Sequence, residues 1–180
     1  RRRRLHAAHE RRRAGPSIAV RGHLVLRVVA QRVLVALLGD DALHAAGRYG
    51  CRVTTTTISP SQYELARERV RAAGLENRVT VLREDYRDLA GTYDKLVSIE
   101  MIEAIGHRQF EEFFRRSAAR LAPGGRMLLQ SITIADHGYA RARDEVDFIK
   151  RYIFPGCCIP SVTVLAQAMT GSSRLRIENL

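Results

Sequence analysis

The 180-residue chain has few cysteines, and their arrangement excludes the common cysteine sites. Cys51, Cys157 and Cys158 form neither a CxxC pair nor a spacing typical of metal ligands. Adjacent cysteines rarely bridge each other because the geometry of a disulfide is restrictive. An odd number of cysteines without a clear secretory signal is typical of the reducing cytosol. We therefore predict a cytoplasmic protein without a metal site.

Long hydrophobic runs are also missing. No apolar stretch approaches the roughly 18 residues that a membrane-spanning helix needs. Residues 24–38 are interrupted by Arg27, Gln31 and Arg32, and they lack a clean signal-peptide core and cleavage site. The sequence therefore predicts neither a membrane-spanning helix nor a secretory leader.

The first fifth of the chain has no lysine and almost no acidic residues. Residues 1–39 contain ten Arg and one acid, Glu10, for a net charge of +9, whereas residues 40–180 carry +2. Such an arm can bind nucleic acid or anionic lipid through phosphate contacts. The alternative, which we favour, is a disordered tail or an out-of-frame reading of GC-rich coding DNA. We divide the chain into this basic segment, 1–39, and a partial domain, 40–180, and expect no nucleic-acid partner.

From residue 41 onward, helical and strand patterns alternate. With 46% hydrophobic residues, the chain is about one globular domain. A strand–helix alternation at this spacing predicts βαβ units and a mostly parallel, twisted α/β sheet with helices on both faces. We expect strands at 52–58, 78–83, 96–99 and 127–134, a turn at 123–125, and helices at 42–49, 60–73, 107–121 and 143–154.

Local signals mark the start and the buried faces of two helices. Ser59 and Pro60 are suited to the cap and first position of a helix, and Gln62 would complete a capping box. Leu65, Ala66, Val70 and Ala73 share one helical face. The later helix carries Phe110, Phe113, Phe114 and Leu121 on one face. We predict that both faces are buried.

The most informative stretch is residues 95–105, where a strand runs into two carboxylates. Glu100 and Glu103 follow an apolar strand, and open α/β sheets bind ligands at the carboxyl ends of their strands. At the end of another strand, Asp85 and Tyr86 have the chemistry to hold an adenine amino group and cover its ring. The alternative for this pair is a turn cap beside a packing tyrosine, and for Glu103 it is an acid favoured by a helix dipole.

An ordered set of motifs resembles a known family. The segments are YRDL (86–89), YDKLVSIEMIEAIG (93–106), LAPGG (121–125), MLLQSITI (127–134) and DFIKRYIFPGCCIPS (147–161). Each is modest alone, but their order and spacing are specific. Over about residues 42–170 the chain resembles the cyclopropane-fatty-acyl-phospholipid synthases, including the mycolic acid cyclopropane synthases. The resemblance implies a Rossmann-like class I methyltransferase fold, here incomplete at both ends.

The resemblance also implies a reaction and its cofactors. The methyl group of S-adenosylmethionine goes to a cis double bond of a phospholipid acyl chain, and loss of a proton closes a three-membered ring. Relatives use a bicarbonate ion as the base. Such an enzyme works from the cytoplasm at the inner face of the membrane, with acyl chains at the membrane surface as its partners.

The implied roles are assigned position by position. Residues matching the cofactor-binding positions are Gly39, Thr57, Ile58, Ser59, Gln62, Asp85 and Tyr86. Glu103 matches the glutamate that helps to hold bicarbonate, and Ile132 matches a position whose backbone contacts the ion. Gln130 replaces a histidine of many relatives and can donate a hydrogen bond, but it cannot carry a proton as histidine does. Some relatives have Gly at the position of Glu100.

Two departures concern the cofactor. The family expects a loop of the type D/E-x-G-x-G-x-G, whereas the matching residues, 35–41, read VALLGDD and keep only Gly39. A Tyr-Ser-Cys type segment is not found in residues 1–34, and relatives continue past Leu180 with further strands and a catalytic tyrosine. We therefore expect that the chain binds the cofactor weakly or not at all. Two alternatives remain: a methyltransferase for another small molecule, and a non-catalytic basic module that binds nucleic acid or anionic lipid.

Overall fold

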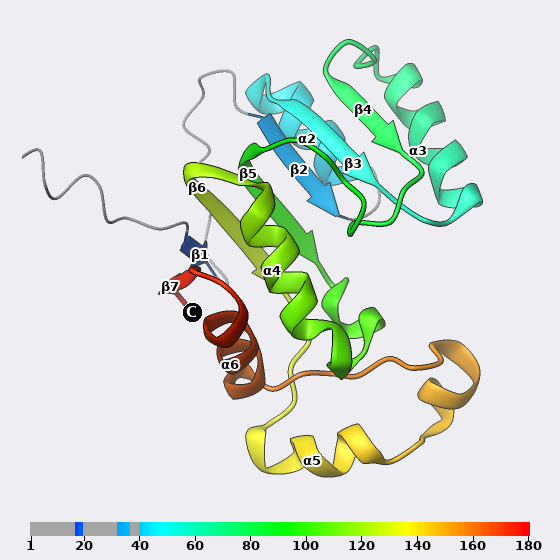
Figure 1. Ribbon diagram of the computed structural model, residues 1–180. Helices are drawn as coiled ribbons and strands as arrows, with labels where there is room; N and C mark the ends of the chain where they lie inside the picture. The colour runs from blue at the N-terminus through cyan, green and yellow to red at the C-terminus, as the bar shows by residue number, and fades with distance from the viewer. Residues whose placement is uncertain (1–16, 20–31, 37–39) are drawn as a thin grey trace, which may run out of the picture.

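The computed structural model describes residues 17–19, 32–36 and 40–180 (Figure 1). Within these residues a seven-stranded sheet has the order β4-β3-β2-β5-β6-β1-β7, and the paired strands run parallel. The strands are β1 (Ser17–Ala19), β2 (Arg32–Ala36), β3 (Arg52–Thr56), β4 (Val79–Leu82), β5 (Tyr93–Ile99), β6 (Leu121–Gln130) and β7 (Arg176–Asn179). The predicted parallel sheet is confirmed.

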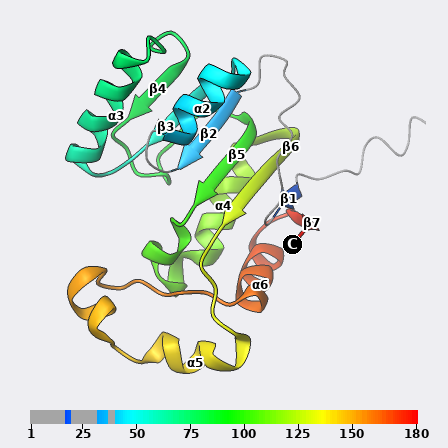
Figure 2. The same cartoon turned by 180° about the vertical axis from the view of Figure 1, so that it is seen from behind.

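Helices cover both faces of the sheet (Figures 1 and 2). Helices α2 (Asp40–Tyr49) and α3 (Pro60–Ala72) lie on one face, and α4 (Phe110–Arg120) and α6 (Val162–Ser172) lie on the other. Helix α5 (Asp136–Asp144) lies beyond the carboxyl end of β6, away from the sheet. This arrangement is the Rossmann-like architecture that the resemblance implies. Within the part of the chain that the structure describes, no helix combines the length and apolar character needed to cross a bilayer.

Each face of the sheet has its own hydrophobic core. On one face, Ala42 and Ala46 of α2 pack near Val53 of β3, with Val70 and Val79 completing the cluster. The core on the other face is larger and contains the aromatic side of α4 together with α6, β5 and β6. Phe110, Phe113, Phe114 and Leu121 are all buried, as predicted. The two cores cover the middle of the sheet on both faces, and the connecting segments lie at its carboxyl edge.

The start of α3 follows the predicted capping signal, although the capping box itself is not formed. The Ser59 hydroxyl accepts the Gln62 backbone N–H, and Pro60 occupies the first turn. The Gln62 side chain does not return to the Ser59 backbone; it accepts the Thr57 hydroxyl instead. Ala66 and Val70 are buried, but Leu65 is 42% exposed, so the buried stripe of α3 is narrower than predicted.

Several predicted elements have different bounds. The helix predicted at 107–121 begins as a 3-10 turn, η3 (His107–Gln109), before α4. The strand predicted at 127–134 ends at Gln130, because Ile134 donates its backbone N–H to Pro160 rather than to a neighbouring strand. The helix predicted at 143–154 was wrong: α5 ends at Asp144, and a separate π-helical turn, η4, spans Ile149–Ile153. Helix α6 was not predicted.

Two strands come from the segment that the charge pattern sets apart. Strand β2 pairs with both β3 and β5 in the middle of the sheet, and β1 pairs with β6 and β7. The Arg blocks at 1–4 and 11–13 lie outside the described residues. The boundary at residue 39 and the out-of-frame hypothesis therefore stay predictions, and resequencing codons 1–40 would decide the latter.

We expect Phe114→Ala to lower the free energy of unfolding by about 3–5 kcal/mol, because Phe114 is 1% exposed and its removal leaves a cavity. Leu65→Ala is the matched control and should cost under about 1 kcal/mol, since that side chain is 42% exposed and its removal leaves no enclosed cavity. Urea denaturation followed by circular dichroism measures both values. Equal losses would contradict the division between buried and exposed faces.

Candidate functional site

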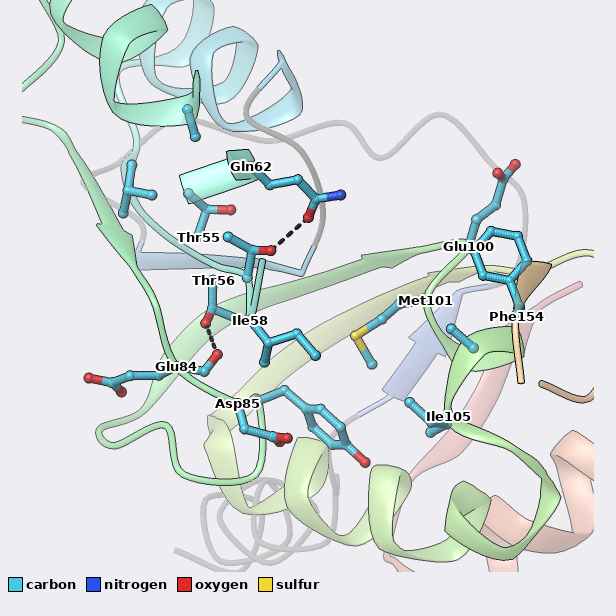
Figure 3. Close-up of a pocket in the computed structure, with 15 residues that line it drawn as sticks. Thr55, Thr56, Ile58, Gln62, Glu84, Asp85, Glu100, Met101, Ile105 and Phe154 are labelled. Carbon is cyan, nitrogen blue, oxygen red and sulfur yellow. Dashed lines mark hydrogen bonds between the residues drawn. The ribbon is translucent and has the colours of Figure 1, made fainter. Parts of the chain in front are cut away.

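A cavity of about 390 Å³ lies at the carboxyl ends of β3, β4 and β5 (Figure 3). Three separate segments line it, together with one residue from a distant loop. The lining residues are Thr55, Thr56, Thr57, Ile58, Gln62, Ala66, Val81, Glu84, Asp85, Tyr86, Glu100, Met101, Ala104, Ile105 and Phe154. The volume is within the range of about 300–1,000 Å³ that is usual for small-molecule sites.

The sheet topology explains why the cavity lies there. From β2, the chain continues through β3 and β4 on one side, and then returns to β5 on the other side of β2. The strand order thus reverses between β2 and β5, and open α/β sheets bind ligands at such a switch point. The sequence predicted a ligand site at the carboxyl ends of the strands, but not the strand order that places the switch point between β2 and β5.

The segment after β3 is held in shape by short-range hydrogen bonds. The Thr57 hydroxyl donates to Gln62 Oε1 at 2.7 Å, and Thr57 Oγ1 accepts the Ser59 backbone N–H at 3.1 Å. Thr57 also donates its own backbone N–H to the Leu82 carbonyl at 3.1 Å. These contacts fix Thr57, Ile58 and Gln62 along the cavity, while Ser59 serves as the cap of α3 and does not line it.

Asp85 and Tyr86 form the wall after β4. Arg87 donates to both carboxylate oxygens of Asp85, at 2.9 and 2.7 Å. This side-chain hydrogen bonding lowers the pKa of Asp85, so the carboxylate stays charged. The Tyr86 ring packs edge-to-face on Phe113, with centroids 5.8 Å apart, and burial raises the pKa of its phenol. The wall therefore has a fixed anion beside a half-buried aromatic ring.

Glu100 has an unusual backbone at the end of β5. Its φ is 48°, and within the described part of the chain it is the one non-glycine residue with positive φ. Two hydrogen bonds link it to Gln130: its backbone N–H donates to the Gln130 carbonyl at 2.9 Å, and Gln130 Nε2 donates to Glu100 Oε1 at 3.2 Å. Glu100 lines the cavity at the end opposite Asp85 (Figure 3).

Glu103 lies in the 3-10 turn η2 (Ile102–Ile105), which follows Glu100. Its Oε1 accepts the Ile132 backbone N–H at 2.5 Å, and its carbonyl accepts the Cys158 N–H at 2.9 Å. Its Oε2 is buried and has no hydrogen-bond partner within the described residues. Glu103 is thus held by Ile132, two residues past the end of β6, and by Cys158, and its second carboxylate oxygen has no partner among the described residues.

A close glycine contact brings Phe154 to the cavity. Gly106 ends η2 at φ +75°, and a Cβ added there would lie 2.5 Å from the Gly156 carbonyl oxygen. The chain after η4 therefore packs directly on η2. Phe154 lies beside Glu100 at one end of the cavity, although its side chain stays 58% exposed (Figure 3).

The predicted residues divide into two neighbouring groups. Thr57, Ile58, Gln62, Asp85 and Tyr86 line the cavity. Glu103, Gln130 and Ile132 lie next to it and are joined through hydrogen bonds with each other or with Glu100. Gly39 lies outside the described residues. The roles of all these residues stay predictions.

Sequence reasoning missed several lining residues. Thr55 and Thr56 precede the matched segment, Met101 and Ile105 flank Glu103, and Phe154 belongs to a motif whose place in space was not predicted. Met101 and Ile105 could have been predicted, because each lies two residues from Glu103 in the sequence. Phe154 reaches the cavity because its segment packs on Gly106, and a contact of this kind produces no periodic pattern in the sequence.

Comparison with known proteins identifies the family. The sequence profile of the mycolic acid cyclopropane synthetases matches residues 38–179. The chain belongs to this family. It is 39% identical over 139 residues to the tuberculostearic acid methyltransferase of Mycobacterium tuberculosis, which covers 77% of this chain and 32% of that protein. It is 37% identical over 131 residues to the cyclopropane-fatty-acyl-phospholipid synthase of Escherichia coli, covering 72% and 32%.

Solved structures of the family share the fold. The cyclopropane synthase MmaA2 of Mycobacterium tuberculosis has a TM-score of 0.68 at 19% identity, over 82% of this chain and 56% of that one. The mycolic acid cyclopropane synthase CmaA1, complexed with SAH and CTAB, has the same TM-score at 21% identity, over 94% and 59%. The chain spans about a third of the length of the curated relatives named above. The resemblance stated from the motifs is confirmed.

The Asp85–Arg87 pair predicts a pH-dependent contribution to stability. Because the pKa of Asp85 is lowered in the folded protein, the pair stabilises the fold above the ordinary Asp pKa of about 3.9, and this stabilisation is lost as pH falls through the lowered value. Arg87→Ala should therefore reduce stability slightly at neutral pH and not at strongly acidic pH. Urea midpoints at several pH values measure this, with Arg83→Ala as control. A difference that persists unchanged in acid would contradict the assignment.

Proposed function

We propose that this chain binds S-adenosylmethionine in the cavity and forms part of an enzyme that modifies the cis double bond of phospholipid acyl chains. One observation carries the proposal: the three segments matched to cofactor binding and catalysis end at one cavity, at the switch point of the sheet. The product would be a cyclopropane ring formed from the transferred methyl group.

The residues present suit the cofactor. The Asp85 carboxylate can accept a hydrogen bond from the adenine amino group, provided that it shares its oxygens with Arg87. The half-buried Tyr86 ring and Ile58 offer apolar surface for the adenine. Thr57 and Gln62 supply polar groups on the same side of the cavity. S-adenosylmethionine, when bound, supplies the electrophilic methyl group.

The chemistry requires alignment more than acid–base strength. An alkene is a weak nucleophile, so the double bond must be held against the methyl donor in a site that excludes water. Ile58 is 73% exposed and Phe154 58% exposed at the cavity, so both offer apolar contact to an acyl chain. Truncation of Phe154, which is not assigned to the adenine, should impair use of the lipid more than binding of the cofactor.

We further propose that the enzyme works at the inner face of the membrane from the cytoplasm. Val146, Phe148 and Tyr152 are 71%, 66% and 64% exposed in the segment that leads to Phe154. Exposed apolar side chains grouped in this way are typical of surfaces that bind proteins or lipids. Because this segment ends at Phe154, which lines the cavity, it supports a route for an acyl chain from the lipid phase.

The family resemblance also predicts bicarbonate, held by Glu103, Gln130 and Ile132. In this chain both donors already face carboxylates: Gln130 Nε2 donates to Glu100, and the Ile132 N–H donates to Glu103. The Glu100 carboxylate adds a negative charge where some relatives have Gly, and two like charges 4 Å apart near a protein surface repel by roughly 4 kcal/mol. The donor set does not suit the ion as it is arranged, so we derive no step through bicarbonate.

The glycine-poor loop predicts weak cofactor binding that can be improved. The variant Leu37→Gly with Asp41→Gly restores two glycines of the family pattern, which allow the backbone to approach a ligand closely. We expect it to bind S-adenosylmethionine at least tenfold more tightly than the unmodified chain, a gain of about 1.4 kcal/mol. Isothermal titration calorimetry measures both affinities.

Two further substitutions in the restored variant test the assignment of the cavity. Tyr86→Ala should weaken binding, because it removes the aromatic wall, whereas Tyr63→Ala should not, because Tyr63 packs under Arg67 on α3 and does not line the cavity. Circular dichroism verifies that each variant is folded. Absence of binding by the restored variant itself would refute the cofactor assignment.

A further inference from the structure

The contact between Glu100 and Gln130 joins two positions at which this chain departs from many relatives. Gln130 replaces a histidine and Glu100 replaces a glycine found in some of them. The register of the sheet pairs Ile99 with Gln130, which places Glu100 next to that glutamine. The two side chains then meet at 3.2 Å through Nε2 and Oε1. The two replaced residues are therefore hydrogen-bonded to each other.

The backbone at Glu100 is suited to glycine, yet a charged side chain is present. A φ of 48° is uncommon for a residue with a Cβ. The conformation is held by the hydrogen bond from the Glu100 N–H to the Gln130 carbonyl, at 2.9 Å. Residues retained in such a conformation cluster at functional sites. Here the conformation lets the Glu100 carboxylate reach the Gln130 amide.

The hydrogen-bond donors of this region are used by the chain itself. Gln130 Nε2 donates to Glu100, and the Ile132 N–H donates to Glu103 Oε1. Glu103 Oε2, in contrast, is buried and has no partner within the part of the chain described. One carboxylate oxygen is therefore anchored, and the other lies buried without a partner in the segment whose Met101, Ala104 and Ile105 line the cavity.

We propose that Glu100 closes this site to bicarbonate by engaging Gln130, and that the Glu103 carboxylate takes the proton in place of the ion. This inference rests on the proposed function. The alkene electron pair forms a bond to the methyl carbon as the carbon–sulfur bond breaks, and the electrons of the broken carbon–sulfur bond stay on sulfur. A C–H bond of the new methyl group then supplies the electron pair that closes the ring, and its proton goes to Glu103 Oε2. Glu100 is a positioning residue, whereas Glu103 is the base.

The first test measures ion binding without turnover. Carbon-13 bicarbonate is titrated with the full chain, with Glu100→Gly, and with Glu76→Gly as a control in an exposed turn, and NMR line broadening reports binding. We expect at least tenfold higher apparent affinity for Glu100→Gly than for the unmodified chain, and no gain for the control. Binding by the unmodified chain would overturn the proposal, as would the absence of a gain in Glu100→Gly.

The second test separates this inference from the proposed function. Calorimetry with S-adenosylmethionine and methyl transfer to vesicles of unsaturated phospholipid are measured on the loop-restored chain, in buffer depleted of or supplemented with bicarbonate. We expect the same rate in both buffers, and at least a hundredfold loss in Glu103→Gln with unchanged cofactor affinity. A rate that requires bicarbonate would overturn the inference and leave the function standing. Lack of cofactor binding or of methyl transfer would refute the function, while the NMR titration still decides the exclusion of the ion.

Discussion

The parallel pairing of β5 between β2 and β6 is the constraint on which the site depends. Because parallel strands end at the same edge, this pairing brings the segments after β3, β4, β5 and β6 together. The two cores bury the strands on both faces, so their carboxyl edge cannot shift relative to the helices. The cavity, Glu100 and the Glu103–Ile132 contact all follow from this edge.

Within this frame, the two ends of the cavity have different electrostatics. At one end, Asp85 is neutralised by Arg87, and Tyr86 supplies an aromatic wall. At the other end, the Glu100 carboxylate accepts a hydrogen bond from the Gln130 amide, and Glu103, which lies next to the cavity, accepts one from the Ile132 backbone amide. Hydrogen bonds of this kind hold a carboxylate in place without cancelling its charge. A sulfonium is a cation, so the carboxylate end is electrostatically suited to it.

Local patterns predicted much of the fold. The β-branched run at 52–58, the cap at Ser59 and the phenylalanine face of α4 are each encoded within a few residues, and the structure contains all three elements. The strand predicted at 127–134 ends at Gln130, and the Ile134 backbone N–H donates to the Pro160 carbonyl instead of to a neighbouring strand. Helix α6 was not predicted because its first three residues, Val162, Thr163 and Val164, are β-branched, and such residues favour strands.

The site was predictable where it follows strand ends and not where it depends on register. Thr57, Asp85 and Tyr86 come within a few residues of their strand ends. The meeting of Glu100 with Gln130, 30 positions apart in the chain, depends instead on the pairing of Ile99 with Gln130. The central claim is that the cavity at this edge holds the cofactor. Hydrogen–deuterium exchange with and without S-adenosylhomocysteine tests it most directly. We predict added protection at 55–62, 84–87 and 100–105 and none across α6; protection confined to α6, or absent from all three segments at saturating ligand, would contradict the account.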